Sequence, residues 1–224
     1  MKINKVALIG AGAIGSYIIW GLSKRDDIEF GVIADGERAQ RLKENGLRIN
    51  DAEYHPQIWS AEEAKGADLI LVALKYGALP GALDYIETAA GENTIVMSLM
   101  NGVDTEEIIA GRIGGERLLY SLIRVSSARD GSCVRFKPES AIGIVYGELN
   151  APYDSERVKA VAELFEGTGI PCRATEHIMP EIWSKFRLNV CNNLPQAILG
   201  AGVGCYKDSE HMKAIRRGLR KELE

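Results

Sequence analysis

Apolar positions recur along the first half of the chain with two different spacings, which alternate. Short apolar runs predict strands, and the stretches between them, with apolar residues at helical spacing, predict helices. Residues 68–74 (DLILVAL) are almost wholly apolar, as expected of a strand buried on both faces of a parallel sheet. Strands are expected at 6–9, 30–34, 68–74 and 94–99, helices at 14–23, 38–45, 79–90 and 105–110 (ending at Gly111), and short extra strands at 47–49 and 57–59. This alternation predicts an α/β fold with a doubly wound sheet.

After Gly115 the pattern changes. Strand-like runs cover 118–128, 132–137 and 141–148, with Asp130-Gly131 as a hairpin turn, and a helix at 155–166 and a strand at 170–174 follow. From Pro180 onward the sequence is helical, with interruptions at Pro195 and at glycines 200, 202 and 204. We therefore expect an α/β domain over 1–174 and a helical domain over 175–224.

The most informative motif joins the first predicted strand to the first predicted helix. It consists of Gly10, Ala11, Gly12, Ala13, Ile14 and Gly15. Gly10 permits a tight turn, Gly12 lets the backbone approach a pyrophosphate, and Gly15 lets the helix pack closely on the sheet. The helix N-terminus supplies N–H groups for phosphates, and Asp35, about 20 residues later, is placed to bind ribose hydroxyls. Glycines also cluster in ordinary turns, but this context favours a dinucleotide-binding loop.

Two polar residues follow other predicted strands. Lys75 comes after the strand at 68–74, and Asn101 comes after the strand at 94–99. Each could be an ordinary loop residue. Ligands in doubly wound folds bind beyond the carboxyl ends of the strands, however, and both residues are expected at the same sheet edge as the glycine loop. This shared position favours a site.

A third group of polar residues lies in the stretch WSKFRLNVCNN of the helical region. Lys185, Asn189 and Asn193 are spaced four apart and so share one helix face. They could form a solvated stripe. Asparagine is, however, a poor helix former in mid-helix, and two of them on one face indicate hydrogen bonding to a ligand.

Composition excludes several classes of function. The net charge of −4 argues against nucleic acid or an anionic membrane as a partner, and no apolar stretch is long enough for a membrane span. The four cysteines and three histidines are scattered, so we expect a cytoplasmic protein with no metal site.

The glycine motif, Lys75, Met100-Asn101-Gly102 and the WSKFRLNVCNN helix together resemble the ketopantoate reductase (2-dehydropantoate 2-reductase) family over nearly the whole chain. The resemblance implies an N-terminal Rossmann domain, a helical substrate or dimerisation domain, and an active site in the cleft between them. Lys185 would then be the general acid that protonates the ketone oxygen, and the reference pKa of lysine, about 10.4, leaves it protonated at neutral pH. Asn101, Asn189 and Asn193 would orient the substrate and Lys185, and Lys75 would lie near the cofactor and substrate.

Two departures from the family pattern matter. The family has an arginine at the end of the second strand that reads the 2′-phosphate of NADP, where this chain has Asp35, with Arg38 and Arg41 just beyond. A carboxylate favours the free 2′-hydroxyl of NAD, the family default favours NADP, and Arg38 could restore NADP binding, so both cofactors stay open. The family also continues through further helices that supply a serine and a glutamate. The chain is therefore expected to be a fragment or a shortened relative, and a homodimer through the helical domain is possible.

Three functions are compatible with these residues. The first is reduction of 2-dehydropantoate to pantoate, in pantothenate and coenzyme A biosynthesis, with hydride from a nicotinamide cofactor. The second is reduction of another 2-oxo acid on the same scaffold. The third is a non-catalytic module that senses a dinucleotide, a role in which Lys185 would have no evident use.

Overall fold

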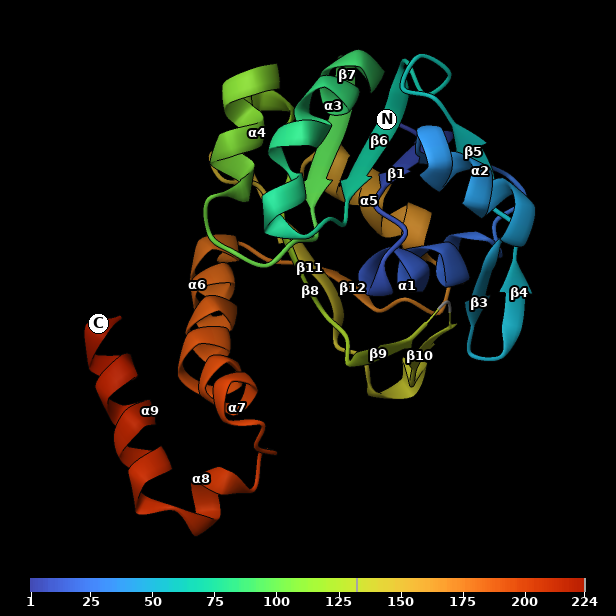
Figure 1. The fold of residues 1–224 in the computed structure, drawn as a ribbon. Coiled ribbons are helices and arrows are strands. Elements are labelled where there is room, and N and C mark those ends of the chain that lie inside the picture. Colours follow the sequence, from blue (N-terminus) through green and yellow to red (C-terminus); the bar gives the residue numbers. More distant parts are fainter. Residues whose placement is uncertain (132, 224) are drawn as a thin grey trace. The chain divides into compact units, whose positions relative to one another are not determined.

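The computed structural model describes residues 1–131 and 133–223. The chain divides into two compact units, Met1–Ile178 and Met179–Glu224 (Figure 1).

A parallel sheet with the strand order β5-β2-β1-β6-β7 forms the centre of the first unit. Its strands are β1 (Lys5–Ile9), β2 (Glu29–Ile33), β5 (Gln57–Trp59), β6 (Ala67–Val72) and β7 (Ala90–Ser98). The helices that follow β1, β2, β6 and β7 along the chain are α1 (Ala13–Leu22), α2 (Gly36–Asn45), α3 (Leu83–Ala89) and α4 (Thr105–Ile113). The strand order reverses at β1, which lies between β2 and β6, so the predicted doubly wound sheet is confirmed.

Two apolar clusters cover the two faces of this sheet. One contains Ile18 and Ile19 of α1, and the other contains Ile86 of α3 and Ile109 of α4. All four side chains are fully buried. Helices on both faces explain why β6 is apolar almost throughout, because neither of its faces meets water.

The later strands belong to two further sheets. One has the order β4-β3-β10-β9 and the other the order β12-β11-β8. Their bounds are β3 (Leu47–Ile49), β4 (Ala52–Tyr54), β8 (Tyr120–Arg124), β9 (Ser127–Asp130), β10 (Cys133–Phe136), β11 (Gly143–Gly147) and β12 (Cys172–Ala174), and helix α5 (Glu156–Phe165) precedes β12. The run at 118–128, expected as one strand, is divided between β8 and β9 because the chain leaves one sheet and enters the other. Ser132, the first residue of the strand expected at 132–137, lies outside the described residues.

Two predicted helices have different bounds in the structure. The helix expected at 79–90 begins as one 3-10 turn, Pro80–Ala82, and α3 starts only at Leu83. Pro80 lies in the first turn of the 3-10 segment, where its missing N–H needs no partner. The helix expected to end at Gly111 continues to Ile113. Gly114, with φ of 91°, provides the backbone conformation that terminates it, whereas Gly111 keeps a helical one.

The second unit consists of helices: α6 (Ile178–Leu188), a π-helical segment (Asn189–Asn193), α7 (Leu194–Leu199), α8 (Cys205–Asp208) and α9 (Glu210–Glu222), the first residue of α6 being counted with the first unit. A break in the helix was expected at Pro195, but the helical path continues through this residue. It lies in the first turn of α7, and the turn before it widens into the π segment. The Tyr206 hydroxyl donates to the carbonyl of Asn192 at 2.7 Å and contacts that of Cys191 at 3.3 Å. These bonds satisfy backbone groups where the hydrogen-bonding pattern changes.

Candidate active site

The three glycines of the loop between β1 and α1 have three different surroundings. Gly10 has φ of 104°, and a Cβ there would lie 2.5 Å from the carbonyl oxygen of Ala73. A Cβ on Gly15 would lie 1.8 Å from the carbonyl oxygen of Gly10 and 3.6 Å from the side chain of Leu8 on β1. Gly15 therefore packs against the loop itself as well as against the sheet. A Cβ on Gly12 would meet nothing within 4 Å. Gly10 and Gly15 therefore shape the loop, and Gly12 leaves open space in front of it.

That open space lies at the N-terminus of α1. Gly12 is the N-cap, and no side chain caps this end of the helix. Gly12, Ala13 and Ile14 are all half-buried, so they are accessible to a ligand. Uncapped N–H groups and the positive end of the helix dipole are suited to a pyrophosphate. The loop thus fits the phosphates of a dinucleotide.

Lys75 and Asn101 follow the two strands next to β1. Ile9 pairs with Val72, and Val72 pairs with Ser98, so β1, β6 and β7 end at the same edge of the sheet. Both polar residues are exposed there. The structure therefore brings Lys75 and Asn101 to the edge that carries the glycine loop.

A hydrogen bond that the sequence did not indicate joins the two loops. The Tyr76 hydroxyl donates to Oδ2 of Asp104 at 2.7 Å, and this bond raises the pKa of Tyr76. Tyr76 is the neighbour of Lys75, and Asp104 lies three residues after Asn101. The bond spans 28 positions of sequence, so no local pattern could have predicted it.

Asp35 lies beyond the end of β2 and is the N-cap of α2, but its side chain makes no capping bond. Its carboxylate instead accepts a hydrogen bond from the hydroxyl of Tyr85 on α3, and this bond raises the pKa of Tyr85. Asp35 is exposed. It can therefore still receive a second hydrogen bond from a ligand hydroxyl.

Arginines gather around a cavity of ≈ 530 Å³ between the glycine loop and α2. Its lining is Ala11, Arg38, Arg41, Leu42, Asn45, Gly46, Leu47, Arg48, Glu53 and Arg129. Burial and the neighbouring charges of Arg41 and Arg129 lower the pKa of Arg38. An anion bound in the cavity would offset the unfavourable charges that surround the Arg38 guanidinium. The contributions of Arg48 and Arg129 were missed. Arg48 lies on β3, just after α2, where no motif marks it, and Arg129 comes from β9, far along the chain from Arg38.

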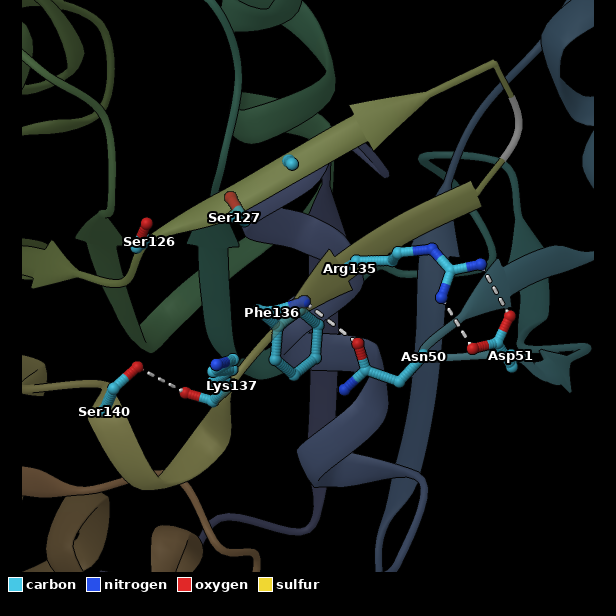
Figure 2. A pocket seen from close by; sticks show the side chains of 9 residues that line it. Asn50, Asp51, Ser126, Ser127, Arg135, Phe136, Lys137 and Ser140 are labelled. Carbon is cyan, nitrogen blue, oxygen red and sulfur yellow. Dashed lines mark hydrogen bonds and ion pairs between the residues drawn. The ribbon is translucent and has the colours of Figure 1, made fainter. Parts of the chain in front are cut away.

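A cavity of ≈ 510 Å³ elsewhere in the first unit contains none of the predicted site residues (Figure 2). Asn50 and Asp51, which line it, have φ of 47° and 69°, and both form hydrogen bonds with residues of β10. Asp51 accepts two hydrogen bonds from Arg135, at 2.7 and 2.8 Å, and Oδ1 of Asn50 accepts one from the backbone N–H of Phe136 at 2.9 Å. These polar groups join the β3–β4 turn to β10 and indicate a structural role.

The remaining predicted residues lie in the second unit. Lys185 is half-buried on α6, and Asn189 and Asn193 begin and end the π segment. Nδ2 of Asn193 donates to Oδ1 of Asn189 at 2.8 Å. The two amides therefore remain neighbours although the helix changes its hydrogen-bonding pattern between them.

Within residues 1–131 and 133–223, no group of three or more His, Cys, Asp or Glu side chains could hold a metal ion. In the same residues no helix is long and apolar enough to cross a membrane.

Comparison with known proteins yields a family match over residues 6–149, to the family described as ketopantoate reductase PanE/ApbA. The chain is 27% identical over 187 residues to a Bacillus subtilis protein named uncharacterized oxidoreductase YkpB, covering 81% of this chain. It spans only 61% of that relative's length. It is 28% identical over 250 residues to 2-dehydropantoate 2-reductase of Mesorhizobium japonicum, covering 98% of this chain and 74% of the relative.

Solved structures show the same fold. The crystal structure of 2-dehydropantoate 2-reductase from Geobacter metallireducens superposes with a TM-score of 0.83 at 26% identity, covering 97% of this chain and 73% of that one. The ternary structure of D-mandelate dehydrogenase with NADH and anilino(oxo)acetate superposes with a TM-score of 0.85 at 22% identity, covering 98% and 72%.

Proposed function

The chain belongs to the ketopantoate reductase PanE/ApbA family, a family of oxidoreductases, and from this premise we propose that it reduces a 2-oxo acid with a nicotinamide dinucleotide. The first candidate substrate is 2-dehydropantoate, which the name of the Mesorhizobium japonicum relative specifies, and the product is then pantoate. The observation that carries the proposal is the common sheet edge at which the glycine loop, Lys75 and Asn101 follow β1, β6 and β7.

The cofactor would supply hydride to the carbonyl carbon. Gly12 and the uncapped start of α1 would hold its phosphates, with the N–H groups of Ala13 and Ile14 directed toward that end of the helix. Asp35 would accept a hydrogen bond from a ribose hydroxyl.

Lys185 would give a proton to the ketone oxygen as the carbon accepts hydride, so that the carbonyl becomes a hydroxyl and the lysine is later reprotonated from water. Asn101 would hold the cofactor and substrate in position, and Lys75 would attract the substrate carboxylate. Asn189 and Asn193 would hydrogen-bond the substrate. Because Asn193 already donates to Asn189, one amide orients the other and leaves a defined set of donors for the ligand.

NADP is the cofactor that the charges favour. Four arginines and one glutamate line the cavity between the glycine loop and α2, and a 2′-phosphate would relieve the mutual repulsion of Arg38, Arg41 and Arg129. Asp35 favours NAD when considered alone, but its carboxylate also accepts the hydroxyl of Tyr85.

The test is a spectrophotometric assay that follows oxidation of NADPH and of NADH in parallel, with 2-dehydropantoate and a panel of other 2-oxo acids. We expect the highest kcat/KM with NADPH and 2-dehydropantoate. A higher kcat/KM for another 2-oxo acid would change the substrate and keep the reaction class, since one scaffold serves several substrates. Tight NADPH binding without turnover of any 2-oxo acid would contradict the proposal. The homodimer expected from the family resemblance remains a prediction, which light scattering checks.

A further inference from the structure

The loop between β7 and α4 carries Asn101 at its exposed surface. Met100, immediately before it, is buried in the apolar cluster that also contains Ile109. Regular strand pairing ends with Ser98, after which the Leu99 N–H still bonds the Val72 carbonyl at 2.8 Å, and helix α4 begins at Thr105. The backbone from Met100 to Asp104 is therefore irregular, and side chains must fix its conformation.

Two buried hydroxyl groups close the base of this loop. The Oγ atom of Ser98 lies 2.8 Å from Oγ1 of Thr105, and both residues are almost completely buried. Thr105 in turn donates to Oε2 of Glu106 at 2.7 Å, and Glu106 is 3% exposed. The three side chains thus form a continuous buried series of hydrogen bonds at the base of the loop that carries Asn101.

The number of hydroxyl protons determines which group donates in each of these hydrogen bonds. Each hydroxyl has one proton to donate. Because Thr105 gives its proton to Glu106, Ser98 must donate to Thr105, and the Ser98 oxygen is left to accept. It faces the backbone N–H of Met100 at 3.4 Å. The residue adjacent to Asn101 is therefore bonded to an oxygen whose orientation depends on Thr105.

Other contacts hold Ser98 without involving Thr105. The Ser121 hydroxyl donates to the carbonyl of Ser98 at 2.7 Å. The hydrogen bond from Tyr76 to Asp104 lies at the far side of the loop and is exposed. Thr105 is thus the group that links the start of the loop to its end, where the loop meets α4.

We propose that Thr105 is a positioning residue for Asn101, acting through the directed chain from Met100 through Ser98 and Thr105 to Glu106. Only the expected effect of Thr105 on kcat rests on the proposed function. The expected effect on the conformation of the loop at residues 100–104, which the Thr105 hydroxyl links at its two ends, does not depend on the reaction.

The test compares Thr105→Val with Thr105→Ser. Valine has nearly the same shape but lacks the hydroxyl, whereas serine keeps it. We expect Thr105→Val to lower kcat for reduction of 2-dehydropantoate by about 10- to 100-fold, the range for a misplaced active-site group. We also expect faster amide hydrogen exchange at residues 100–104. Thr105→Ser should restore most of the activity and the protection.

Thr94→Val is the matched control, in the middle of β7 and four residues before Ser98. Thr94 is also buried, and its hydroxyl donates to the carbonyl of Ala67 and accepts from the N–H of Gly91, both at 2.6 Å. This variant should lose thermal stability as Thr105→Val does while keeping wild-type kcat and loop exchange. Equal losses of kcat in the two valine variants, or no rescue by serine, would overturn the proposal. If the wild-type protein reduces no 2-oxo acid, the proposed function fails, and the exchange comparison still decides the role of Thr105.

Discussion

The glycine loop and the Lys185 helix present their polar groups in different ways. The loop is fixed by atoms in van der Waals contact, since a single added carbon on Gly10 or Gly15 would collide with a backbone carbonyl. In the helical unit, the positions of Asn189 and Asn193 are set by the π-helical segment that they begin and end. This unit is less tightly packed, since apolar side chains such as Ile198 and Val203 are 73% and 71% exposed. We infer that substitutions in the loop act first on folding, and substitutions on the Lys185 helix act first on chemistry.

Replacing Lys185 tests the chemical side of this comparison most directly. We expect Lys185→Ala to lower kcat by about 100-fold or more, because a general acid contributes roughly 10²–10⁴ to the rate. The Kd of NADPH, measured by fluorescence titration, should be unchanged. Arg187→Ala is the control, since it removes a positive charge from an exposed position of the same helix. Comparable kcat values for both variants would refute the assignment.

Gly15→Ala tests the folding side. Its Cβ would lie 1.8 Å from the Gly10 oxygen, so the loop or the helix must move. We expect the free energy of unfolding to fall by about 1–3 kcal/mol, the usual cost of overpacking, and dinucleotide binding to weaken with it. Urea denaturation measures the first and NADPH titration the second.

Gly111→Ala is the matched control for this variant. Gly111 lies within α4, and a Cβ there would meet nothing within 4 Å. Because alanine is the better helix former, stability should rise by up to about 1 kcal/mol. A Gly15→Ala protein as stable as wild type would show that packing does not fix the loop.

Arg38→Ala tests which cofactor the protein prefers, NADPH or NADH. Loss of a charge-assisted hydrogen bond to a phosphate should raise the Kd of NADPH about tenfold and leave the Kd of NADH unchanged. Lys43→Ala, which removes an exposed charge from the same helix, should affect neither. An equal loss for both cofactors would mean that Arg38 supports the fold of the cavity instead.

Tyr206→Phe should have the smallest effect. It removes the hydroxyl that bonds the carbonyls of Cys191 and Asn192 beside the π segment, which is worth about 1 kcal/mol. We expect a small fall in thermal stability and a smaller loss of kcat than for Lys185→Ala. Tyr153→Phe, at an exposed tyrosine, is the control. A kcat loss as large as that of Lys185→Ala would place the π segment itself among the determinants of catalysis.

Local patterns predicted the parts of the fold that local forces determine. The apolar run of β6 and the glycine spacing after β1 were sufficient for the sheet and its nucleotide loop, because burial and backbone freedom leave direct marks on composition. Helix ends were less accessible. The sequence pattern predicted that the helix ends at Gly111, and only the structure shows that Gly114, three residues later, has the positive φ that terminates it.

The candidate site was predictable one element at a time and not across elements. Lys75 and Asn101 could be found because both follow apolar strands. The bonds that arrange them, from Tyr76 to Asp104 and from Ser98 through Thr105 to Glu106, required the loops to be folded. The same holds for Arg129, which reaches the cavity beside Arg38 from strand β9.

The open space at Gly12 has a consequence for any experiment that selects variants from a library. A selection for well-folded protein would reject alanine at positions 10 and 15 and accept it at position 12, because only the first two collide with the backbone. A selection for dinucleotide binding would reject all three. If alanine at position 12 is accepted in the first selection and rejected in the second, the dinucleotide approaches the backbone at Gly12. This result would not require a structure with the ligand bound.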